Sequence, residues 1–513
     1  MIRFAAGSKV SRKMHIAWSL SIVCCLLLFL SMGWPALARK ATPPAEFDLV
    51  ILGGRVMDPE TGLDAVRNVG IRGGKIQAIT TGILRGKSSI DAKGLVVAPG
   101  FIDLHAHGQD EENYNYYAMD GVTTALELEI GVADIDHFYA DREGKALINY
   151  GASVGHVPLR MELMHDPALG RSILPSGDGA KRPATEEDIA MMKEGISRGL
   201  QRGGLGVGFG IQYISASSRH EILEMFGVAG GFGATCFVHL RSAGAREPSN
   251  GLQGLEEVIA ASAISGAPLH VVHITSMELK VTPQLLAMIT GARAHGLDVT
   301  TECYPYSAAQ TDLASEVFSE GWQEAMGISY GDLQWVLTGE RLTADTFAKY
   351  RKIGGMVVIH SIPEDVVRLA ISSPITMIAS DAFLHNGAGH PRAAGTFARV
   401  LGRYVREEKV ISLMDGLKKM TLMPAQRLEK YAPVFKNKGR IRVGADADIT
   451  IFDPMTVIDK ATYEQPANYS AGIEYVLVNG VAVVEGGKLK AGAHPGKGAR
   501  APIRTTSRPK IAK

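Results

Sequence analysis

The sequence predicts an α/β protein: a (β/α)8 barrel of the TIM type, joined to a small β-sandwich built from both ends of the chain. Through the middle of the chain, short apolar segments of strand length alternate with longer helical segments, which is typical of parallel α/β folds. On either side of that region, β-branched runs alternate with glycine-containing turns. A chain of 513 residues is long enough for one large domain and a smaller companion.

The first 38 residues have the pattern of an export signal. Basic residues precede an apolar run over residues 16–34, and Pro35, Ala36, Leu37 and Ala38 follow it with the small residues that signal peptidase requires. We therefore expect a signal peptide over residues 1–38, cleavage after Ala38, and an exported, periplasmic protein. The apolar run approaches the ~20 residues that span a bilayer, so an uncleaved N-terminal membrane anchor is the alternative.

Both ends of the mature chain contribute to the predicted β-sandwich. Residues 46–97 contain DLVILGGRVMD, and residues 432–490 contain YVLVNGVAVVEGGKLK, two segments rich in β-branched residues and bounded by turns. Residues 491–513 are rich in Gly, Pro and basic residues and show no apolar periodicity. That last segment is predicted to be a flexible tail.

Residues 98–431 are predicted to form the catalytic barrel. Nine segments in this region have the character of strands, one more than the barrel needs. The surplus segment, GGMVVIHS, is assigned to an insertion at about residues 311–361. The eight barrel strands are expected in GFIDLHAH, TTALELE, GASVGHVPL, GVGFGI, TCFVHLR, PLHVVHI, DVTTECYPY and TMIASDA.

Composition narrows the classes of partner. Apolar residues make up 46% and charged residues 21% of the chain, which is ordinary for a globular protein. The formal net charge is +1, so no global field attracts nucleic acid or an anionic membrane surface. A small-molecule substrate is therefore expected, with no nucleic-acid partner. The sequence does not define the oligomeric state.

Four histidines and one aspartate end several of the predicted strands. His105 and His107 lie two residues apart, so both project from the same face of the first barrel strand. His239 and His273 each close a further apolar strand, and Asp381 closes the last one. Enzymes with this barrel place their chemistry at the C-terminal ends of the strands. The set predicts a site for one or two divalent metal ions, with zinc as the expected cofactor.

Longer segments carry a resemblance to a known family. PGFIDLHAH, the GVTT before the second strand, the strand-terminal histidines and the SD of the last strand resemble the amidohydrolase superfamily. Further segments resemble its D-aminoacylase branch, the N-acyl-D-amino-acid deacylases: YPY, HPRAAGTFARVLGRYVRE, MTLMPAQR, GRIRVGADADITIFDP and ATYEQPANYSAGIEYVLVNG. Together they extend over nearly the whole chain after the predicted signal.

The resemblance implies roles for the strand-terminal residues. His239 and His273 match the family's tightly held metal ligands. His105 and His107 match the pair at a second metal position. Asp381 matches the catalytic aspartate.

The resemblance also implies the substrate-binding residues. Arg392 lies where the family binds the α-carboxylate of the substrate, and a guanidinium fork suits a carboxylate. Tyr213 and Tyr304 match tyrosines that line the scissile amide. Thr275 and Gln310 depart from the family pattern, which leaves the preferred acyl group and side chain open.

The second strand also departs from that pattern. Where the family commonly has a cysteine ligand, TTALELE offers Glu127 and Glu129 on one face. A carboxylate can serve as a metal ligand in place of a thiolate. Glu129 lies nearer the end of the strand and is the predicted ligand, with Glu127 as the alternative. An oxygen ligand that can bridge favours two metal ions over one.

These observations predict metal-dependent hydrolysis of the amide bond of N-acyl-D-amino acids, releasing a carboxylic acid and a D-amino acid. The D configuration rests on the resemblance alone. N-acyl-D-glutamate is the suggested substrate, because the glutamate-containing second strand resembles a subgroup described in that way. The alternative enzymes are a cyclic-amide hydrolase, of the hydantoinase or dihydroorotase type, and a dipeptidase. A non-catalytic exported binding protein is the alternative outside enzymes.

Overall fold

The computed structural model describes residues 46–244 and 250–504 of the chain. The predicted signal peptide lies outside these residues. The described residues from Phe47 onward form one compact unit. No helix within the described ranges is long and apolar enough to cross a membrane.

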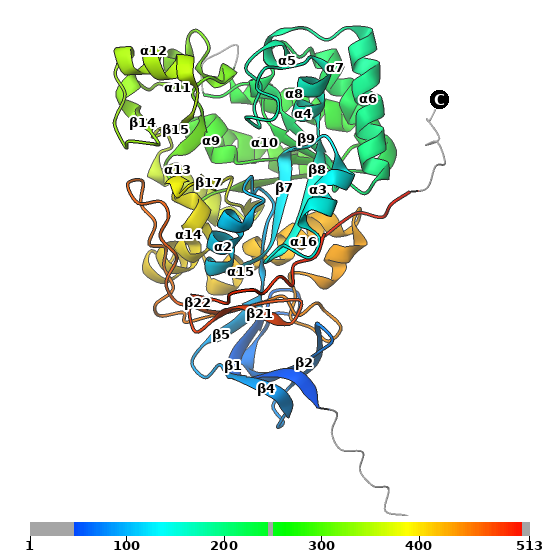
Figure 1. The fold of residues 1–513 in the computed structure, drawn as a ribbon, viewed down its shortest axis with the longest axis vertical. Helices are drawn as coiled ribbons and strands as arrows, with labels where there is room; N and C mark the ends of the chain where they lie inside the picture. The colour runs from blue at the N-terminus through cyan, green and yellow to red at the C-terminus, as the bar shows by residue number, and fades with distance from the viewer. Residues whose placement is uncertain (1–45, 245–249, 505–513) are drawn as a thin grey trace, which may run out of the picture. The chain divides into compact units, whose positions relative to one another are not determined.

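Eight parallel strands form the predicted barrel (Figure 1). Each of the eight segments predicted from the sequence contributes one strand. The two end strands of the sheet are joined just beyond their last residues, where Ala106 forms a parallel bridge with Ala382. In sheet order the strands are β6 (Phe101–Asp103), β7 (Val122–Val132), β8 (Asn149–Gly155), β9 (Val207–Gly210), β10 (Cys236–His239), β11 (Leu269–Val271), β12 (Val299–Cys303) and β16 (Thr376–Ile378).

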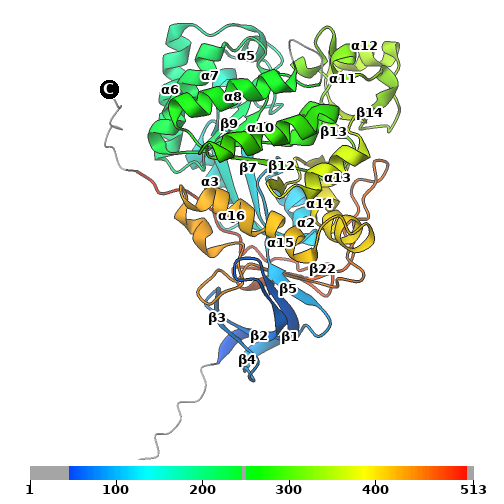
Figure 2. The ribbon, with the colours of Figure 1, turned by 180° about the vertical axis from the view of Figure 1, so that it is seen from behind.

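Helices surround these strands, and Figure 2 shows α8 and α10 side by side on the outside of the barrel. Their inward residues are apolar and join the strands in one large hydrophobic core. The longer helices are α2 (Glu111–Met119), α3 (Ile135–Arg142), α4 (His156–Leu163), α6 (Glu186–Gln201), α7 (Arg219–Phe232), α8 (Gly251–Ser265), α10 (Thr282–Ala294), α13 (Glu364–Ser372), α14 (Arg392–Arg399), α15 (Leu413–Met420) and α16 (Leu422–Glu429).

The insertion forms a small antiparallel sheet of its own. It contains β13 (Ala309–Asp312), β14 (Leu333–Trp335) and β15 (Met356–Ile359), with β15 in the middle. The surplus segment GGMVVIHS supplies β15 and therefore lies outside the barrel, as predicted. The helices α11 (Trp322–Met326) and α12 (Ala344–Ile353) pack here through stacked aromatic rings of Trp322 and Phe347.

The two chain ends meet in a single sheet of nine strands. Its central junction is the antiparallel pairing of β5 (Val96–Pro99) with β19 (Ile449–Phe452). The strands β1 (Phe47–Asp58), β2 (Leu63–Arg72), β3 (Lys75–Thr80) and β4 (Gly86–Asp91) extend one side, and β20 (Ile473–Val478), β21 (Val481–Glu485) and β22 (Lys488–Leu489) extend the other. The predicted contribution of both ends to one β-rich region is confirmed.

The prediction of a flexible tail from residue 491 is wrong for its described part. The backbone N–H of Ala499 donates to Tyr150 O at 2.7 Å, and that of Ala501 donates to Gly203 O at 3.0 Å. Both alanine side chains are buried in the core. Pairing along an extended backbone needs no apolar periodicity, so composition could not reveal this contact. Residues 505–513 lie outside the described part.

Truncation tests this contact. A chain ending at residue 494 loses these backbone hydrogen bonds and the burial of Ala499 and Ala501, so it should be less stable than the full chain by about 2–4 kcal/mol. The measurement is the midpoint of thermal unfolding. A chain ending at residue 504 is the control and should unfold at the same temperature as the full chain. Equal midpoints for both truncations would contradict a stabilising role.

Candidate metal centre and substrate site

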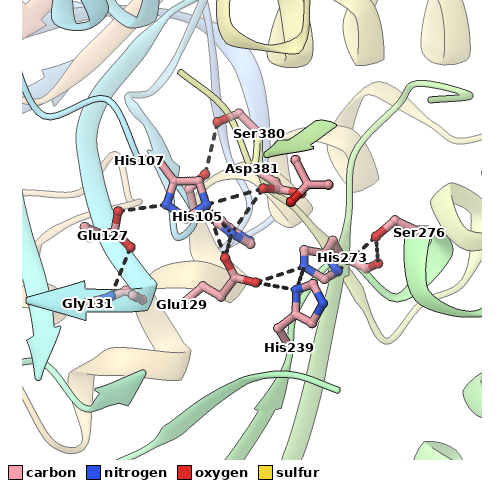
Figure 3. Close-up of polar contacts among 12 residues, drawn as sticks. His105, His107, Glu127, Glu129, Gly131, His239, His273, Ser276, Ser380 and Asp381 are labelled. Carbon is pink, nitrogen blue, oxygen red and sulfur yellow. Dashed lines mark hydrogen bonds and ion pairs between the residues drawn. The ribbon is translucent and has the colours of Figure 1, made fainter. Parts of the chain in front are cut away.

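The five strand-terminal residues of the sequence prediction converge at one end of the barrel (Figure 3). His105 and His107 follow β6, His239 is the last residue of β10, and His273 lies two residues after β11. Asp381 lies three residues after β16. All five side chains are buried or nearly so. The C-terminal ends of parallel strands place them at the same edge, as expected for this barrel.

Glu129 on β7 joins these histidines into one cluster. Its Oε2 lies 3.0 Å from His105 Nε2 and 3.2 Å from His107 Nε2. Its Oε1 lies 2.8 Å from His239 Nδ1 and 3.1 Å from His273 Nε2. Each oxygen of one carboxylate therefore faces a different histidine pair (Figure 3). This is the arrangement of a carboxylate placed to bridge two metal ions.

Two overlapping groups of side chains could hold metal ions. The first contains His105, His107, Glu129 and Asp381, and the second contains Glu129, His239 and His273. Within each group the ligand atoms lie within 4.8 Å of one another. Imidazole nitrogens and carboxylate oxygens are the ligands that zinc takes in catalytic sites. The residues present therefore fit one or two divalent ions. Of the two glutamates that the sequence left as candidate ligands, Glu129 belongs to both groups and Glu127 to neither.

The charges of the cluster also favour a bound cation. Burial lowers the pKa of His105, but the carboxylates of Asp381 and Glu129 outweigh it and raise this pKa to about 10. Burial raises the pKa of Glu129, yet the surrounding histidines hold it well below its usual range. The carboxylate is thus ionised and available as a ligand.

A layer of hydrogen bonds orients the histidines of the first group. Glu302 Oε1 lies 2.7 Å from His105 Nδ1, and Glu302 Oε2 lies 3.1 Å from His270 Nε2. Glu127 Oε2 lies 2.8 Å from His107 Nδ1, so Glu127 supports a ligand instead of coordinating an ion itself. A proton on each Nδ1 leaves each Nε2 lone pair free for a metal ion.

The second pair is oriented in the same manner. Ser276 Oγ lies 3.0 Å from His273 Nδ1, and Gln212 Oε1 lies 3.0 Å from His239 Nε2. The free nitrogens, His273 Nε2 and His239 Nδ1, then face Glu129. Sequence reasoning missed Gln212, Ser276 and Glu302. Only Glu302 left a signal: it lies in the seventh predicted barrel strand, DVTTECYPY, two residues before Tyr304, so the strand period predicts that both face the same interior.

Asp381 lies between the metal ligands and Arg392. Its Oδ1 is 3.4 Å from the Nε2 atoms of both His105 and His107, and its Oδ2 is 2.9 Å from Arg392 Nη1. Burial raises the pKa of Asp381, but the charges of Arg392 and His105 lower it below its usual range. The carboxylate is therefore ionised and can accept a proton. Its backbone φ of 52° lies in the left-handed region, which non-glycine residues seldom adopt.

Arg392, the first residue of α14, presents a buried guanidinium beside Asp381. Its Nη1 lies 2.9 Å from Asp381 Oδ2, but neither Nη1 nor Nε makes a well-aligned hydrogen bond with a described residue. The guanidinium carbon lies 4.4 Å above the ring of Tyr304. The backbone N–H of Arg392 donates to His390 Nδ1 at 3.0 Å, and His390 Nε2 donates to Ala308 O at 3.0 Å. A guanidinium whose donors are not engaged in aligned hydrogen bonds suits a planar anion such as a carboxylate.

Two cavities flank the metal ligands. The larger, of about 500 Å³ including space open to solvent, is lined by His239, His273 and Asp381. The smaller, of about 320 Å³, is lined by His107, Glu129, Asp381 and Arg392. Tyr213, Gln310 and Thr311 line both cavities.

The two predicted tyrosines occupy different places. The ring of Tyr213 lies 4.6 Å from that of His239, and its hydroxyl lies 3.4 Å from Thr311 Oγ1. Tyr213 therefore lies beside the metal ligands, where the resemblance expects it. Tyr304 lines neither cavity and is buried under Arg392, so its contact with the site is through that guanidinium.

Comparison with known proteins agrees with the geometry. The sequence pattern of the Amidohydrolase family matches residues 197–484, more than half of the chain. The chain belongs to the amidohydrolase family.

Three of its curated relatives are deacylases of N-acyl-D-amino acids. The chain is 30% identical over 486 residues to the N-acyl-D-glutamate deacylase of Alcaligenes xylosoxydans xylosoxydans, covering 85% of this chain and 94% of the relative. It is 30% identical over 484 residues to the D-aminoacylase of the same organism, with the same coverages. These matches place it in the N-acyl-D-amino-acid deacylase branch.

Solved structures give the same result. The N-acyl-D-glutamate deacylase from Bordetella bronchiseptica, complexed with zinc and a phosphonate inhibitor, has a TM-score of 0.76 and 27% identity, covering 89% of this chain and 100% of that one. A D-aminoacylase structure has a TM-score of 0.75 and 26% identity over 88% of this chain and 100% of that one.

The orienting role of Glu302 can be tested through metal affinity. Glu302→Gln removes the charge behind His105 and leaves one acceptor for two histidines, so zinc should bind about 10–100-fold more weakly. Zinc titration against a competing chelator measures this. The control is Glu485→Gln, an exposed glutamate in β21 that should leave affinity unchanged. Equal zinc affinity for the two variants would show that Glu302 does not orient the metal ligands.

Proposed function

We propose that this protein hydrolyses the amide bond of N-acyl-D-amino acids, releasing a carboxylic acid and a D-amino acid, with one or two zinc ions at the cluster around Glu129. The observation that carries this proposal is the position of Arg392. Its guanidinium lies 2.9 Å from Asp381 Oδ2, so a substrate carboxylate held there brings the neighbouring amide to the metal ligands. The similarity to three curated deacylases of N-acyl-D-amino acids supports it.

His105, His107, Glu129, His239 and His273 would hold the metal. A divalent ion there supplies Lewis-acid chemistry, because it polarises the amide carbonyl and makes water nucleophilic near neutral pH. A similar D-aminoacylase, with a TM-score of 0.76, has a binuclear metal centre. The carboxylate of Glu129, with an oxygen toward each histidine pair, supports the same for this chain.

Asp381 performs the proton transfers. Its ionised carboxylate accepts a proton from the attacking water and then returns it to the nitrogen of the leaving amine. Because its Oδ2 also contacts Arg392, a substrate carboxylate competes for that guanidinium and frees the oxygen. Tyr213, beside His239, lies close enough to the site to contact the reacting amide.

The choice of enantiomer and the role of Asp381 can be tested together. The metal-loaded protein should release amine from N-acetyl-D-amino acids and not from their L counterparts. Asp381→Asn should lower kcat by about 10²–10⁴-fold, because it removes the general base, while metal stays bound. The assay is amine release, with metal content measured on the same samples.

Asp141→Asn provides the control, since this exposed residue of α3 lies outside the cluster. Inactivity toward both enantiomers with metal bound would contradict the deacylase assignment and direct the search to cyclic amides and dipeptides. Full activity in Asp381→Asn would contradict the mechanism. Ligand binding without any turnover would support a binding protein.

We also propose that the protein is exported to the periplasm after cleavage behind Ala38. The support is the basic start, the apolar run over residues 16–34 and the small residues before Arg39. The N-terminal residue of the protein recovered from the periplasmic fraction should be Arg39. Recovery in the membrane fraction with residues 1–38 intact would favour the anchored alternative.

A further inference from the structure

We propose that this enzyme prefers substrates whose D side chain and acyl group are both uncharged, so that acidic N-acyl-D-amino acids such as N-acyl-D-glutamate are poor substrates. This inference rests on the proposed function and names its substrate class. It follows from the residues that line the two cavities beside the metal ligands.

The larger cavity has an apolar wall. Apart from the metal-site residues, it is lined by the apolar side chains of Ala243, Leu279, Val317, Met326 and Ile359. Its remaining polar residues are neutral amides and hydroxyls: Gln212, Tyr213, Ser276, Gln310, Thr311 and Ser361. Among the described residues that line this cavity, none carries an amino or guanidinium group.

The smaller cavity is similar except at one point. Its apolar wall consists of Ile130, Ile173, Leu174, Met356 and Phe383. Arg392 is the one Lys or Arg among the described residues that line it. The described residues that line the two cavities thus offer a single guanidinium.

A basic side chain just after β10 is already paired. Arg241, two residues after His239, donates from Nε and Nη2 to the two carboxylate oxygens of Glu257 at 2.8 and 2.7 Å. A bidentate pair of this kind leaves no net charge for a ligand. Arg241 therefore does not alter the charge available in the cavities.

The charge balance then determines the substrate class. An N-acyl-amino acid has one α-carboxylate, and it can replace Asp381 Oδ2 as the partner of Arg392. A second carboxylate, on the side chain or on the acyl group, would enter an apolar cavity beside Glu129 and Asp381 without a Lys or Arg partner among the described lining residues. Burial of an unpaired charge is strongly unfavourable. The same expectation applies to either cavity, because the described lining of neither contains a second Lys or Arg.

The first test compares two substrates that differ in charge and hardly in shape. With the zinc-loaded full chain, kcat/KM should be at least about 100-fold higher for N-acetyl-D-glutamine than for N-acetyl-D-glutamate, because only the latter buries an unpaired carboxylate. N-acetyl-D-leucine and N-acetyl-D-methionine should be cleaved at least as well as the glutamine compound. Equal or faster cleavage of N-acetyl-D-glutamate would overturn the inference and leave the proposed function standing.

The second test supplies the missing cation. Met326, at the end of α11, and Met356, in β15, are half-buried methionines in the larger and the smaller cavity. Met326→Lys and Met356→Lys each place an ammonium group in one cavity, and Met326→Gln and Met356→Gln are neutral controls of similar size. One lysine variant should cleave N-acetyl-D-glutamate at least about 10-fold better than its glutamine control. The cavity that contains this lysine is then the one that receives the side chain of the substrate. If neither does so, charge is not what excludes the acid.

The outcomes for the two proposals are separable. If no N-acetyl-D-amino acid is cleaved although zinc is bound, the proposed function fails and the inference falls with it. If all are cleaved and the acidic one is cleaved best, only the inference fails. Binding of N-acetyl-D-glutamine and N-acetyl-D-glutamate to Asp381→Asn, measured by calorimetry, should show the same order without turnover.

Discussion

The contact of one carboxylate with four imidazoles is the interaction on which the site depends. Glu129 reaches one histidine pair with Oε1 and the other with Oε2, at distances from 2.8 to 3.2 Å. Without it, the pairs would be two separate histidine clusters on different strands of the barrel. With it, they form two ligand groups that share one residue. The roles proposed for Arg392, as the substrate anchor, and for Asp381, in proton transfer, both depend on where these residues lie relative to this centre.

Other parts of the structure keep that contact in place. Glu127 and Glu302 fix the ring orientations of His107 and His105, which ensures that their Nε2 atoms face Glu129. The backbone N–H of Asp381 donates to His105 O at 2.7 Å, at the junction of the first and last barrel strands. Closure of the barrel and assembly of the site therefore use the same residues. The left-handed backbone at Asp381 is a local strain that the closed barrel supports.

Much of this arrangement could be predicted from the sequence, because strand period and strand ends are local properties. They placed the four histidines and Asp381 at one edge of the barrel. Contacts between distant segments could not be predicted in this way. Glu127 and Glu129 share one strand face, so the sequence alone does not show which of them is the metal ligand and which of them orients a ligand. Glu302 acts through His105, almost two hundred residues earlier, and residues 496–504 bind the barrel through backbone hydrogen bonds to segments far away in the sequence.

The most direct test of the account is an anomalous-difference map at the zinc absorption edge, from crystals of the full chain grown with excess zinc. We expect zinc peaks near His105 and His107, near His239 and His273, or at both positions, with an oxygen of Glu129 beside each peak. The absence of any peak beside Glu129, or a Glu129 side chain turned away from every peak, would contradict the claim that this carboxylate joins the two halves of the site.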